Sequence, residues 1–413
     1  MAVNGKQNIL EEIRQNGFSF EWLAEAGQFP ILQKLKEVPQ NPEYHGEGDV
    51  YTHTRMLCRE MIKLPQWQAL DPKEQELVFL AGAFHDLGKL LCTKWDDGKW
   101  TSPKHTIVGA RMFRELAYRE GRRFGLSFRE REQAAALIRL HGLPVWFWTK
   151  RRPEFDLHKA AQSVSLKLLY ILSKADTLGR IGSEPGEMEQ KVDYFWEYAC
   201  ELGIGETRGS FFNGYSRFQY FHKEDMEPGA QLYDSTEFDV YVMSGLPLSG
   251  KDTWIEKHGK DLSVISLDQI REEFKISPTD GSARVVTIAN RRARTLLREK
   301  KPFIWNATNL MEDIRQRLVG LFSGYGARVH FIYLETPYSE MMRRNQERER
   351  YIPEPVLETM IGKWEPPAPW EGYSVHYVYL ADDTATDNPP GAYPGHRAVI
   401  SDERAEKQYG TDE

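Results

Sequence analysis

The spacing of apolar and polar positions divides the chain into two parts. In roughly the first 200 residues, apolar side chains recur at helical spacing, as in residues 71–88, 129–143 and 157–179. A proline stands near the expected start of the first of these segments, and Gly179 ends the third. We therefore expect the N-terminal part to be mainly helical.

From residue 237 onward the pattern changes, because short apolar runs alternate with amphipathic segments. The runs predict strands at 238–246, 262–268, 301–308 and 327–335. The amphipathic segments predict helices beginning at 251 and covering 282–300 and 311–326. Strands that alternate with helices are typical of a parallel sheet covered on both faces, so an α/β domain is expected here.

Residues 206–236 are rich in glycine and aromatic side chains and lack helical periodicity. We interpret them as an irregular connector that packs on another part of the protein, since a solvated linker would carry fewer rings. The expected organisation is a helical domain at 1–205, this connector, an α/β domain at 237–385 and a fraying tail at 386–413. The length of 413 residues also favours two domains.

Composition narrows the class of protein. The net charge of −7 gives no global attraction for nucleic acid, so affinity for phosphate must come from local clusters. The three cysteines have no zinc-binding spacing and are expected to be reduced, mostly buried thiols of a cytoplasmic protein. The N-terminus does not look like a signal peptide, and no apolar run is long enough for a membrane span, so no membrane partner is expected.

Residues 245–251 fit the pattern of a glycine-rich phosphate-binding loop between a predicted strand and a predicted helix. In such a loop, successive backbone N–H groups surround a phosphate, and the lysine reaches the β- and γ-phosphates of ATP or another NTP. The usual Ser or Thr after the lysine is replaced, so the residue that serves Mg²⁺ stays open between two neighbours. The expected nucleotide contacts are Gly245, Ser249, Gly250, Lys251, Asp252 and Thr253.

Two further groups of polar residues follow predicted strands of the α/β part. Asp268 comes after the second strand, where a carboxylate lies in the ligand crevice and can accept a proton from an attacking hydroxyl. The alternative is that Asp268 only caps the next helix. Arg271 would share its helical face and bind a phosphate of the acceptor. The arginines within 343–350 suit a lid over the triphosphate, or else a solvated helix face.

The helical part carries histidines and aspartates on apolar segments. His85 and Asp86 are adjacent within one such segment, where two polar side chains need buried partners, and a divalent cation satisfies both. Any single one of these histidines is more simply interpreted as a hydrogen-bonded core residue. The set as a whole favours a metal site, and its candidate ligands are His53, His85, Asp86, His105, His141 and Asp176.

The loop, the Asp-x-x-Arg motif and the arginine run together resemble the polynucleotide 5′-kinase branch of P-loop phosphotransferases over about residues 238–380. The resemblance implies that Lys251 and Asp268 are catalytic, with Asp268 the general base for a 5′-hydroxyl, and that Arg271 contacts the acceptor's phosphate. It also implies that lid arginines contact the donor's phosphates. These are Arg344 and Arg348, or Arg343 or Arg350 if the register differs.

The order His53, His85-Asp86, Asp176 resembles the HD phosphohydrolase superfamily over about residues 15–200. The resemblance implies an all-helical fold in which these four residues bind one divalent metal ion. It also implies that His105 and His141 hold a second ion, and that Lys89 contacts the substrate phosphate. Two ions would activate the attacking water and hold the phosphoryl oxygens.

The fusion order resembles the bacterial HD-domain polynucleotide kinase/phosphatases. It implies NTP-dependent phosphorylation of 5′-OH ends and removal of 2′,3′-cyclic, 2′- or 3′-phosphate from RNA ends. Broken or single-stranded RNA or DNA ends would be the substrates, and an RNA ligase a partner. Two alternatives stay open: a nucleotide-metabolism phosphohydrolase fused to a small-molecule kinase, and a non-catalytic NTP-binding switch.

Overall fold

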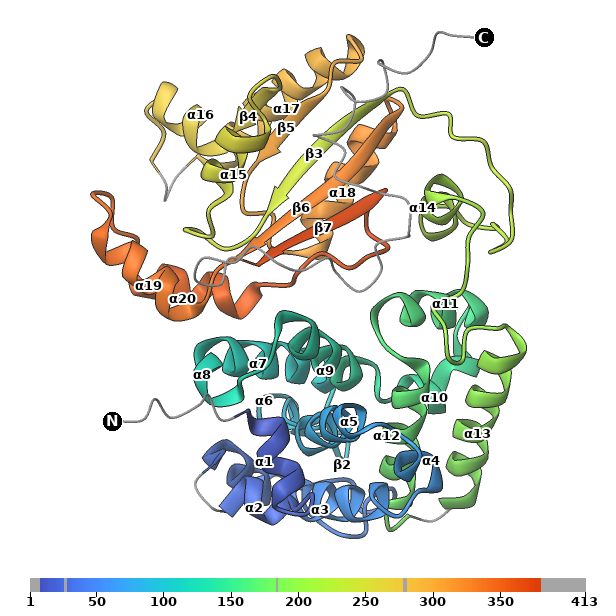
Figure 1. Cartoon of the computed structure of the whole chain (residues 1–413). Helices are drawn as coiled ribbons and strands as arrows, with labels where there is room; N and C mark the ends of the chain where they lie inside the picture. The colour runs from blue at the N-terminus through green and yellow to red at the C-terminus, as the bar shows by residue number, and fades with distance from the viewer. Residues whose placement is uncertain (1–7, 26–27, 183–184, 278–280, 380–413) are drawn as a thin grey trace, which may run out of the picture. The chain divides into compact units, whose positions relative to one another are not determined.

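The computed structural model describes residues 8–379, except 26–27, 183–184 and 278–280. The chain folds into two compact units, the first built mainly from residues up to Phe211 and the second mainly from residues after it (Figure 1). The predicted tail at 386–413 lies outside the described residues.

Unit 1 is helical apart from one short hairpin. Its elements in chain order are α1 (Ile9–Gln15), α2 (Phe20–Glu25), η1 (Pro30–Glu37), α3 (Val50–Met61), α4 (Pro65–Gln68), α5 (Pro72–Phe84), α6 (Lys89–Cys92), β1 (Lys94–Asp96), β2 (Lys99–Thr101), α7 (His105–Arg119), α8 (Gly121–Phe124), α9 (Phe128–Leu140), α10 (Leu143–Trp146), η2 (Phe147–Thr149), α11 (Pro153–Ser163), α12 (Leu166–Leu178) and α13 (Pro185–Glu201).

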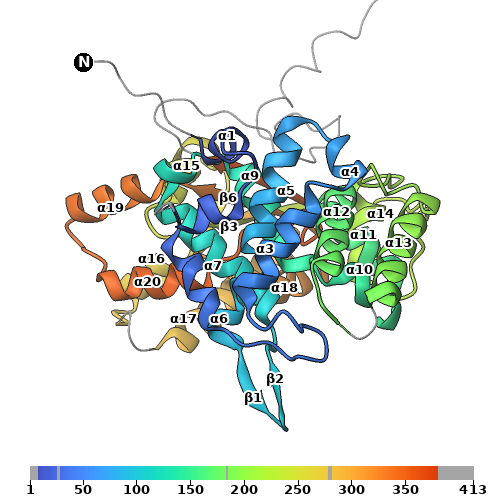
Figure 2. The same cartoon turned by 90° about the horizontal axis from the view of Figure 1, so that it is seen from below.

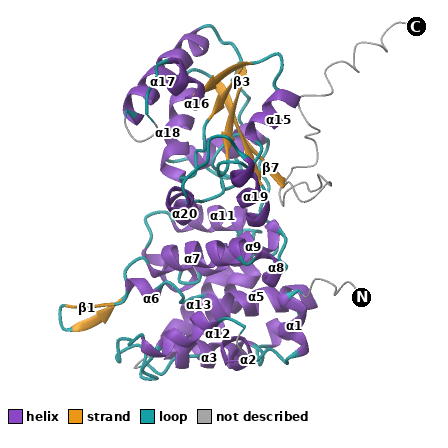
Figure 3. Ribbon diagram, turned by 90° about the vertical axis from the view of Figure 1, so that its left-hand side faces the viewer, coloured by secondary structure: helices purple, strands orange, loops and turns teal. Residues whose placement is uncertain are grey.

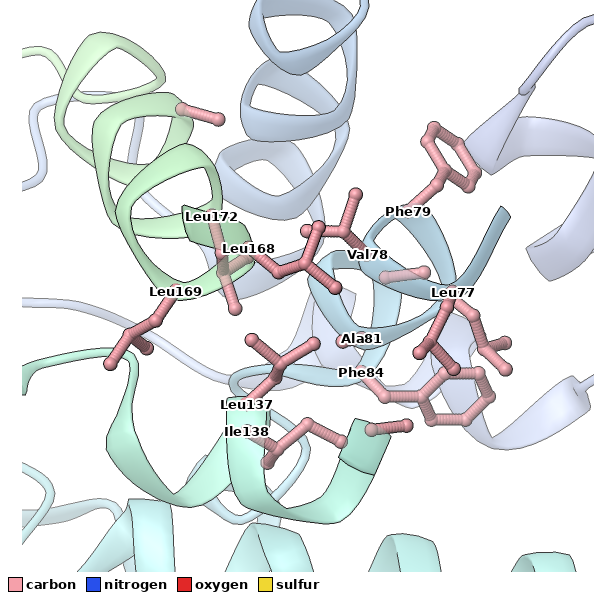
Figure 4. Packing of buried hydrophobic residues seen from close by; sticks show 14 of the residues in the cluster. Leu77, Val78, Phe79, Ala81, Phe84, Leu137, Ile138, Leu168, Leu169 and Leu172 are labelled. Atoms are coloured by element: carbon pink, nitrogen blue, oxygen red, sulfur yellow. The ribbon is translucent and has the colours of Figure 1, made fainter. Parts of the chain in front are cut away.

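Helix α5 is the centre of the core of unit 1. Asp71 caps its N-terminus by accepting from the backbone N–H groups of Lys73 and Glu74, and every residue from Glu76 to Phe84 is buried. A helix that is apolar on all sides must be surrounded, and Figure 4 shows side chains of α9 and α12 packed around it. This packing holds the C-terminal end of α5, where His85 and Asp86 follow, in a fixed position.

Two local features of unit 1 differ from the sequence-based expectation. The segment 157–179 was expected to be one helix, but it breaks at Val164, whose backbone is extended, and Ser165 then caps α12. The hairpin β1–β2 was not predicted. Its strands pair antiparallel around Asp97-Gly98, and both residues adopt the positive φ angles that a tight hairpin turn requires.

Unit 2 contains a five-stranded parallel sheet in the order β4-β5-β3-β6-β7. Its elements are α14 (Gly214–His222), β3 (Phe238–Ser244), α15 (Lys251–His258), β4 (Ser263–Ser266), α16 (Leu267–Glu273), α17 (Ser282–Arg298), β5 (Phe303–Asn306), α18 (Glu312–Ser323), β6 (Ala327–Glu335), α19 (Tyr338–Glu347), α20 (Glu354–Lys363) and β7 (Ser374–Tyr379).

Helices cover both faces of the sheet, as the alternating pattern predicted. On one face, side chains of β3 and β5 pack against α17 and α18, while Ile255 of α15 packs on the other. The central strand β3 has neighbours that follow it in the chain on both sides, so ligands are expected beyond its carboxyl end. All four predicted strands are present.

The fifth strand, β7, was not predicted from the sequence. It lies at the edge of the sheet next to β6, and every one of its residues is only partly buried. Its sequence places Ser374 and His376 on either side of Val375, so it gives no continuous apolar run.

The prediction that 206–236 is irregular is wrong for its middle part, which forms helix α14. Asn213 caps this helix by accepting from the backbone N–H of Ser216 at 2.7 Å. Arg217 donates to the carbonyl oxygens of Pro369 and Tyr373, which attaches α14 to the segment before β7. Aromatic rings on several faces of α14 hide its helical period in the sequence.

The cysteines form no disulfide among the described residues. Cys58 is buried, but Cys200 is exposed, so the expectation of mostly buried thiols is wrong for Cys200. Within the described part of the chain, no helix combines the length and the apolar character that crossing a lipid bilayer requires.

Candidate functional site

The HD residues come together from three helices of unit 1. His53 lies in the first turn of α3, and Asp176 lies near the C-terminal end of α12. His85 and Asp86 were expected inside a helix, but α5 ends at Phe84 and the pair forms the turn that follows. The turn closes at Gly88, where any side chain would collide with the backbone of α7: a Cβ would lie 2.1 Å from the carbonyl oxygen of His105.

The four side chains converge, and each is almost completely buried. Nε2 of His53 lies 2.9 Å from Oδ1 of Asp176, and Nε2 of His85 lies 3.1 Å from Oδ2 of Asp86. The crossed distances are 3.8 Å from His85 to Asp176 and 3.9 Å from His53 to Asp86. The predicted ligand set therefore surrounds one point.

Asp86 connects this group to the two remaining histidines. Its second oxygen, Oδ1, lies 3.3 Å from Nε2 of His105 and 3.9 Å from Nε2 of His141. One oxygen of the carboxylate thus faces His53 and His85, and the other faces His105 and His141. A carboxylate placed in this way would be able to bind two neighbouring cations, one through each oxygen.

The backbone sets which nitrogen of each histidine is available as a ligand. Nδ1 of His85, His105 and His141 donates to the carbonyl oxygen three residues earlier, at 2.8, 2.8 and 2.9 Å. Because a carbonyl oxygen only accepts, Nδ1 carries a proton in each ring, and Nε2 is the nitrogen that faces Asp86 and is available to a metal ion. In His53, Nδ1 faces the carbonyl oxygen of Gly179 and the carboxylate of Glu47.

The centre therefore places Nε2 atoms of imidazole rings against carboxylate oxygens, and each such pair needs a proton or a metal ion between its two atoms. Among the described residues, Nε2 of His85 and Oδ1 of Asp86 are buried without a hydrogen-bond partner. Burial raises the pKa of Asp86, but His85 and Lys89 outweigh it and hold that pKa well below its usual range, so the carboxylate is ionised. Buried imidazoles and an ionised carboxylate fit divalent transition metals.

Lys89 lies at the edge of this centre. Its ammonium contacts Oδ2 of Asp86 at 2.8 Å and donates to Oε1 of Gln40 at 2.7 Å. Arg180, which the sequence analysis missed, pairs with Asp176 four residues earlier, and its charge helps to hold the pKa of Asp176 down against the effect of burial. The Asp-x-x-x-Arg spacing at a helix end was the signal that could have revealed Arg180.

His45 and Glu47 were also missed, although they lie close to His53 in the sequence. Oε1 of Glu47 lies 2.8 Å from Nδ1 of His45 and 3.0 Å from Nδ1 of His53. Oε2 accepts from the backbone N–H of Ile181 at 3.0 Å, and the Glu47 side chain is fully buried. Burial alone would raise the pKa of Glu47, but the two histidines lower it, so Glu47 remains charged beside His53.

In unit 2, the loop after β3 has the conformation that a phosphate cradle needs. Gly245 and Gly250 have φ angles of 141° and 89°, and a Cβ on Gly245 would lie 2.2 Å from the carbonyl oxygen of Leu334. Only glycine fits the first position, because both the angle and the space exclude a side chain. Helix α15 begins at Lys251, so its N-terminal N–H groups point into the loop.

Lys251 folds over the loop. Its ammonium donates to the carbonyl oxygens of Gly245 and Leu246 at 3.0 and 2.7 Å, and to Oγ of Ser249 at 3.3 Å. Burial lowers the pKa of Lys251 to about 8, although the nearby charges of Asp252 and Asp268 act in the opposite direction. The negative charges of both carboxylates therefore act on the Lys251 ammonium at the carboxyl end of the sheet.

Asp252 and Thr253 are the two candidates for the residue that contacts Mg²⁺, and both are exposed. Oδ1 of Asp252 accepts from Nδ2 of Asn306 at 2.7 Å. Asn306 is the last residue of β5, and the sequence analysis missed it, although a polar residue at the carboxyl end of an apolar strand was a usable signal. The contact fixes the Asp252 carboxylate at the mouth of the loop.

Asp268 lies in the first turn of α16, where the helix N-cap is Ser266 and not Asp268. The alternative interpretation of Asp268 as a capping residue is therefore wrong. Arg271 donates to the carbonyl oxygen of Ser277 and to Oγ of Ser282, so its contacts lie away from the loop.

The arginines of the predicted lid point in different directions. Arg344 donates to the carbonyl oxygen of Leu248, in the middle of the phosphate-binding loop, at 3.0 Å. Arg343 pairs with Glu340 and Glu347 on the exposed surface of α19, and Arg350 pairs with Glu272. Arg348 is exposed at the C-terminal end of α19. Arg344 is therefore the lid arginine that contacts the phosphate-binding loop.

Comparison with known protein families agrees with both halves of this description. The HD domain family matches residues 49–180, and an AAA domain family matches residues 240–367. Neither match spans half of the chain. The protein thus combines a helical HD domain with a kinase-like P-loop domain built on a parallel sheet. The domains imply enzymatic activity that uses an NTP with Mg²⁺ in one and divalent metal in the other.

The individual proteins that match this chain have low sequence identity to it. The L-seryl-tRNA(Sec) kinase of Methanococcus maripaludis is 26% identical over 135 residues, which are 31% of this chain and 53% of that protein. The chain thus spans about half the length of this curated relative. A solved structure from Chloroflexus aurantiacus, provisionally assigned as a kinase, covers 34% of this chain and 88% of its own at 17% identity and a TM-score of 0.30.

Proposed function

We propose that this protein repairs broken nucleic-acid ends. Its P-loop domain would transfer a phosphoryl group from an NTP to a 5′-hydroxyl, and its HD domain would remove 2′,3′-cyclic, 2′- or 3′-phosphate from RNA ends. The observation that carries the proposal is the presence, in one chain, of two separate sites for phosphorus chemistry. One is the histidine and aspartate centre around Asp86, and the other is the loop that ends at Lys251.

In the HD domain, the ligands would be His53, His85, Asp86 and Asp176 for one ion, with His105 and His141 for a second that shares Asp86. Bound divalent metal would supply an activated water and neutralise charge on the phosphoryl oxygens. The protein's own cations extend this function. Lys89 lies beside Asp86, and Arg180 beside Asp176, so both can bind the oxygens of a phosphate that enters the centre.

In the P-loop domain, backbone N–H groups of the loop would hold the NTP phosphates, and Lys251 would exchange its carbonyl partners for phosphate oxygens. Asp268 would take the proton from the acceptor hydroxyl, since its charge already acts on Lys251. Arg344, which contacts the loop at Leu248, would spread the charge that develops during transfer.

A nucleic-acid acceptor is favoured by what the two activities achieve together. Strand breaks in RNA often leave a 5′-hydroxyl and a 2′,3′-cyclic phosphate, while a ligase needs the opposite pair, 5′-phosphate and 3′-hydroxyl. The name of the M. maripaludis relative also describes a kinase that acts on a group carried by an RNA. An RNA ligase would then be the functional partner.

The test is one assay on a single-stranded RNA oligonucleotide that carries a 5′-hydroxyl and a 2′,3′-cyclic phosphate. We expect label from γ-labelled ATP to enter the 5′ end in the presence of Mg²⁺. We also expect the cyclic phosphate to disappear in a reaction that a chelator stops and Mn²⁺ restores.

Two variants separate the activities. Lys251→Ala should reduce label transfer about a hundredfold or more and leave phosphate removal intact, and His85→Ala should do the reverse. Label on free nucleosides but not on the oligonucleotide would favour the small-molecule kinase. Parallel loss of both activities in either variant would contradict two separate sites.

A further inference from the structure

The residue directly after Lys251 is where this chain departs from the usual phosphate-binding loop. Asp252 stands at the position where Ser or Thr is typical, and Thr253 offers a hydroxyl one residue later. Two side chains of different chemistry therefore compete for the Mg²⁺ that accompanies an NTP. The geometry of helix α15 distinguishes between them.

Helix α15 packs on the sheet through Ile255, and this contact fixes the direction of the side chains before it. Figure 3 shows α15 and α17 on opposite sides of the sheet. Because successive helical residues are about 100° apart around the axis, Asp252, three residues before Ile255, points within about 60° of the sheet-facing side. Thr253, two residues before Ile255, points about 160° away from that side.

The contacts of Asp252 agree with this direction. Its Oδ1 accepts from Nδ2 of Asn306 at 2.7 Å, and Asn306 is the buried last residue of β5, which lies next to β3 in the sheet. The backbone N–H of Gly245 donates to the carbonyl oxygen of Thr308 at 2.9 Å, so the segment after β5 is attached to the first residue of the loop. The Asp252 carboxylate is therefore held at the carboxyl ends of the strands, where parallel sheets bind their ligands.

The second oxygen of this carboxylate is available to a cation. Among the described residues, Oδ2 of Asp252 has no hydrogen-bond or ion-pair partner. Burial lowers the pKa of Lys251 and the charge of Asp252 opposes this effect, so the carboxylate lies close to the ammonium that would meet the phosphates. Carboxylate oxygens fit Mg²⁺, which proteins usually bind through one or two carboxylates together with the phosphates of a substrate.

We propose that Asp252, and not Thr253, binds the Mg²⁺ of the NTP, and that Asn306 is the positioning residue that orients its carboxylate. The inference rests on nucleotide binding by the proposed kinase and is independent of the acceptor. It also gives the loop a property that a hydroxyl does not provide. The carboxylate repels the phosphates of a metal-free nucleotide, so the loop selects the Mg²⁺ complex more strongly than a loop with Ser or Thr.

The experiment measures how tightly the full-length protein binds a fluorescent, non-hydrolysable ATP analogue, once with excess Mg²⁺ and once with EDTA. The ratio of the two dissociation constants is the gain in affinity from Mg²⁺. Asp252→Asn should weaken binding about tenfold or more with Mg²⁺ and tighten it with EDTA, because the change removes both a ligand and a repulsion. Damage to the packing of α15 would instead weaken binding under both conditions.

Three further variants separate the roles of the neighbouring side chains. Asn306→Ala should lower the gain from Mg²⁺ about tenfold and leave binding in EDTA unchanged within about twofold, since the charge of Asp252 remains. Asp252→Ser restores the residue usual in such loops, so it should keep a gain from Mg²⁺ and bind the metal-free analogue more tightly than the wild type. Thr253→Val, which loses the hydroxyl but keeps the shape, should keep the wild-type gain.

Two controls define the background. Lys251→Ala should abolish binding by the loop, so any binding that remains belongs elsewhere and is subtracted. Asp97 lies at the tip of the hairpin β1–β2, which projects from the helical body of unit 1 (Figures 2 and 3). Asp97→Asn removes an exposed carboxylate from the other unit and should leave both dissociation constants at their wild-type values.

The outcomes separate this inference from the proposed function. A wild-type gain in Asp252→Asn, or a lost gain in Thr253→Val, would overturn the assignment of Mg²⁺ to Asp252 and leave the kinase intact. If the analogue binds with the expected ratios but no label reaches the RNA, the proposed acceptor fails and the inference stands. If the wild-type protein does not bind the analogue with Mg²⁺, both fail.

Discussion

The buried carboxylate of Glu47 leads to the sharpest prediction about the metal centre. Its two oxygens accept from Nδ1 of His45, Nδ1 of His53 and the backbone N–H of Ile181, at distances of 2.8 to 3.0 Å. With Nδ1 of His53 held as a donor, Nε2 keeps its lone pair for a metal ion, and the negative charge makes that lone pair more basic. Glu47 is thus a positioning residue that acts through His53.

The substitution Glu47→Gln keeps the size of the side chain and removes the charge. Its amide oxygen can still accept one of the three donors, while its NH₂ group faces the others. Loss of such an outer partner costs about 10- to 100-fold in metal affinity, or about 1.4 to 2.7 kcal/mol. Glu47→Ala is less informative, because each buried donor left unpaired costs about 1–3 kcal/mol of folding stability.

The assay is Mn²⁺ titration of chelator-treated protein, followed both by calorimetry and by hydrolysis of a nucleoside 2′,3′-cyclic phosphate. For Glu47→Gln we expect a higher dissociation constant for Mn²⁺ but near-normal turnover at saturating metal. Glu43→Gln, an exposed carboxylate four residues away, is the control. An unchanged dissociation constant in Glu47→Gln would refute the positioning role, and so would an equal loss in Glu43→Gln.

Three further predictions concern other residues. Asp268→Asn should lower kcat of the kinase by about 10²- to 10⁴-fold with little change in KM for NTP, and a similar loss of phosphatase activity would contradict its role as base. Arg344→Ala should reduce kinase kcat/KM by about 10²-fold or more, while Arg343→Ala, which loses only exposed ion pairs, should stay within about threefold in the same assay. Burial lowers the pKa of His158 to about 4, so the unfolded chain binds more protons between pH 6.5 and 4 and stability falls as the pH falls through that window. The unfolding midpoint in urea should therefore drop less from pH 7 to pH 5 in His158→Gln than in the wild type, and equal drops would show that His158 does not contribute.

Much of the fold could be predicted because it follows from local patterns. The alternating texture after residue 237 identifies four of the five strands, and the all-apolar sequence of α5 identifies the central helix. The features that were not predicted depend on tertiary packing, which the local sequence pattern does not show. Val164 interrupts a long periodic run, and the polar residues of β7 interrupt the apolar run that would have revealed a strand.

The candidate sites show the same difference between residues that local patterns reveal and residues that only tertiary packing brings together. Histidines and aspartates on apolar helices were conspicuous because such residues are costly to bury without partners. Glu47 and Gln40 lie in a polar loop, where a carboxylate or an amide needs no explanation, and only the fold shows that they are buried beside His53 and Lys89. The direction of each arginine after β6 likewise depends on tertiary contacts, which spacing alone does not give.

Three histidines of the metal centre are oriented by hydrogen bonds to carbonyl groups in their own turns, so local unfolding of one turn can disrupt metal binding. His85 and His141 are the residues at which α5 and α9 end, and each is oriented by the last turn of its helix. Fraying of a single turn would rotate an imidazole away from Asp86 while the apolar core stayed packed. Sensitivity to such fraying is therefore a property of the helix ends, and it is separate from the stability of the apolar core.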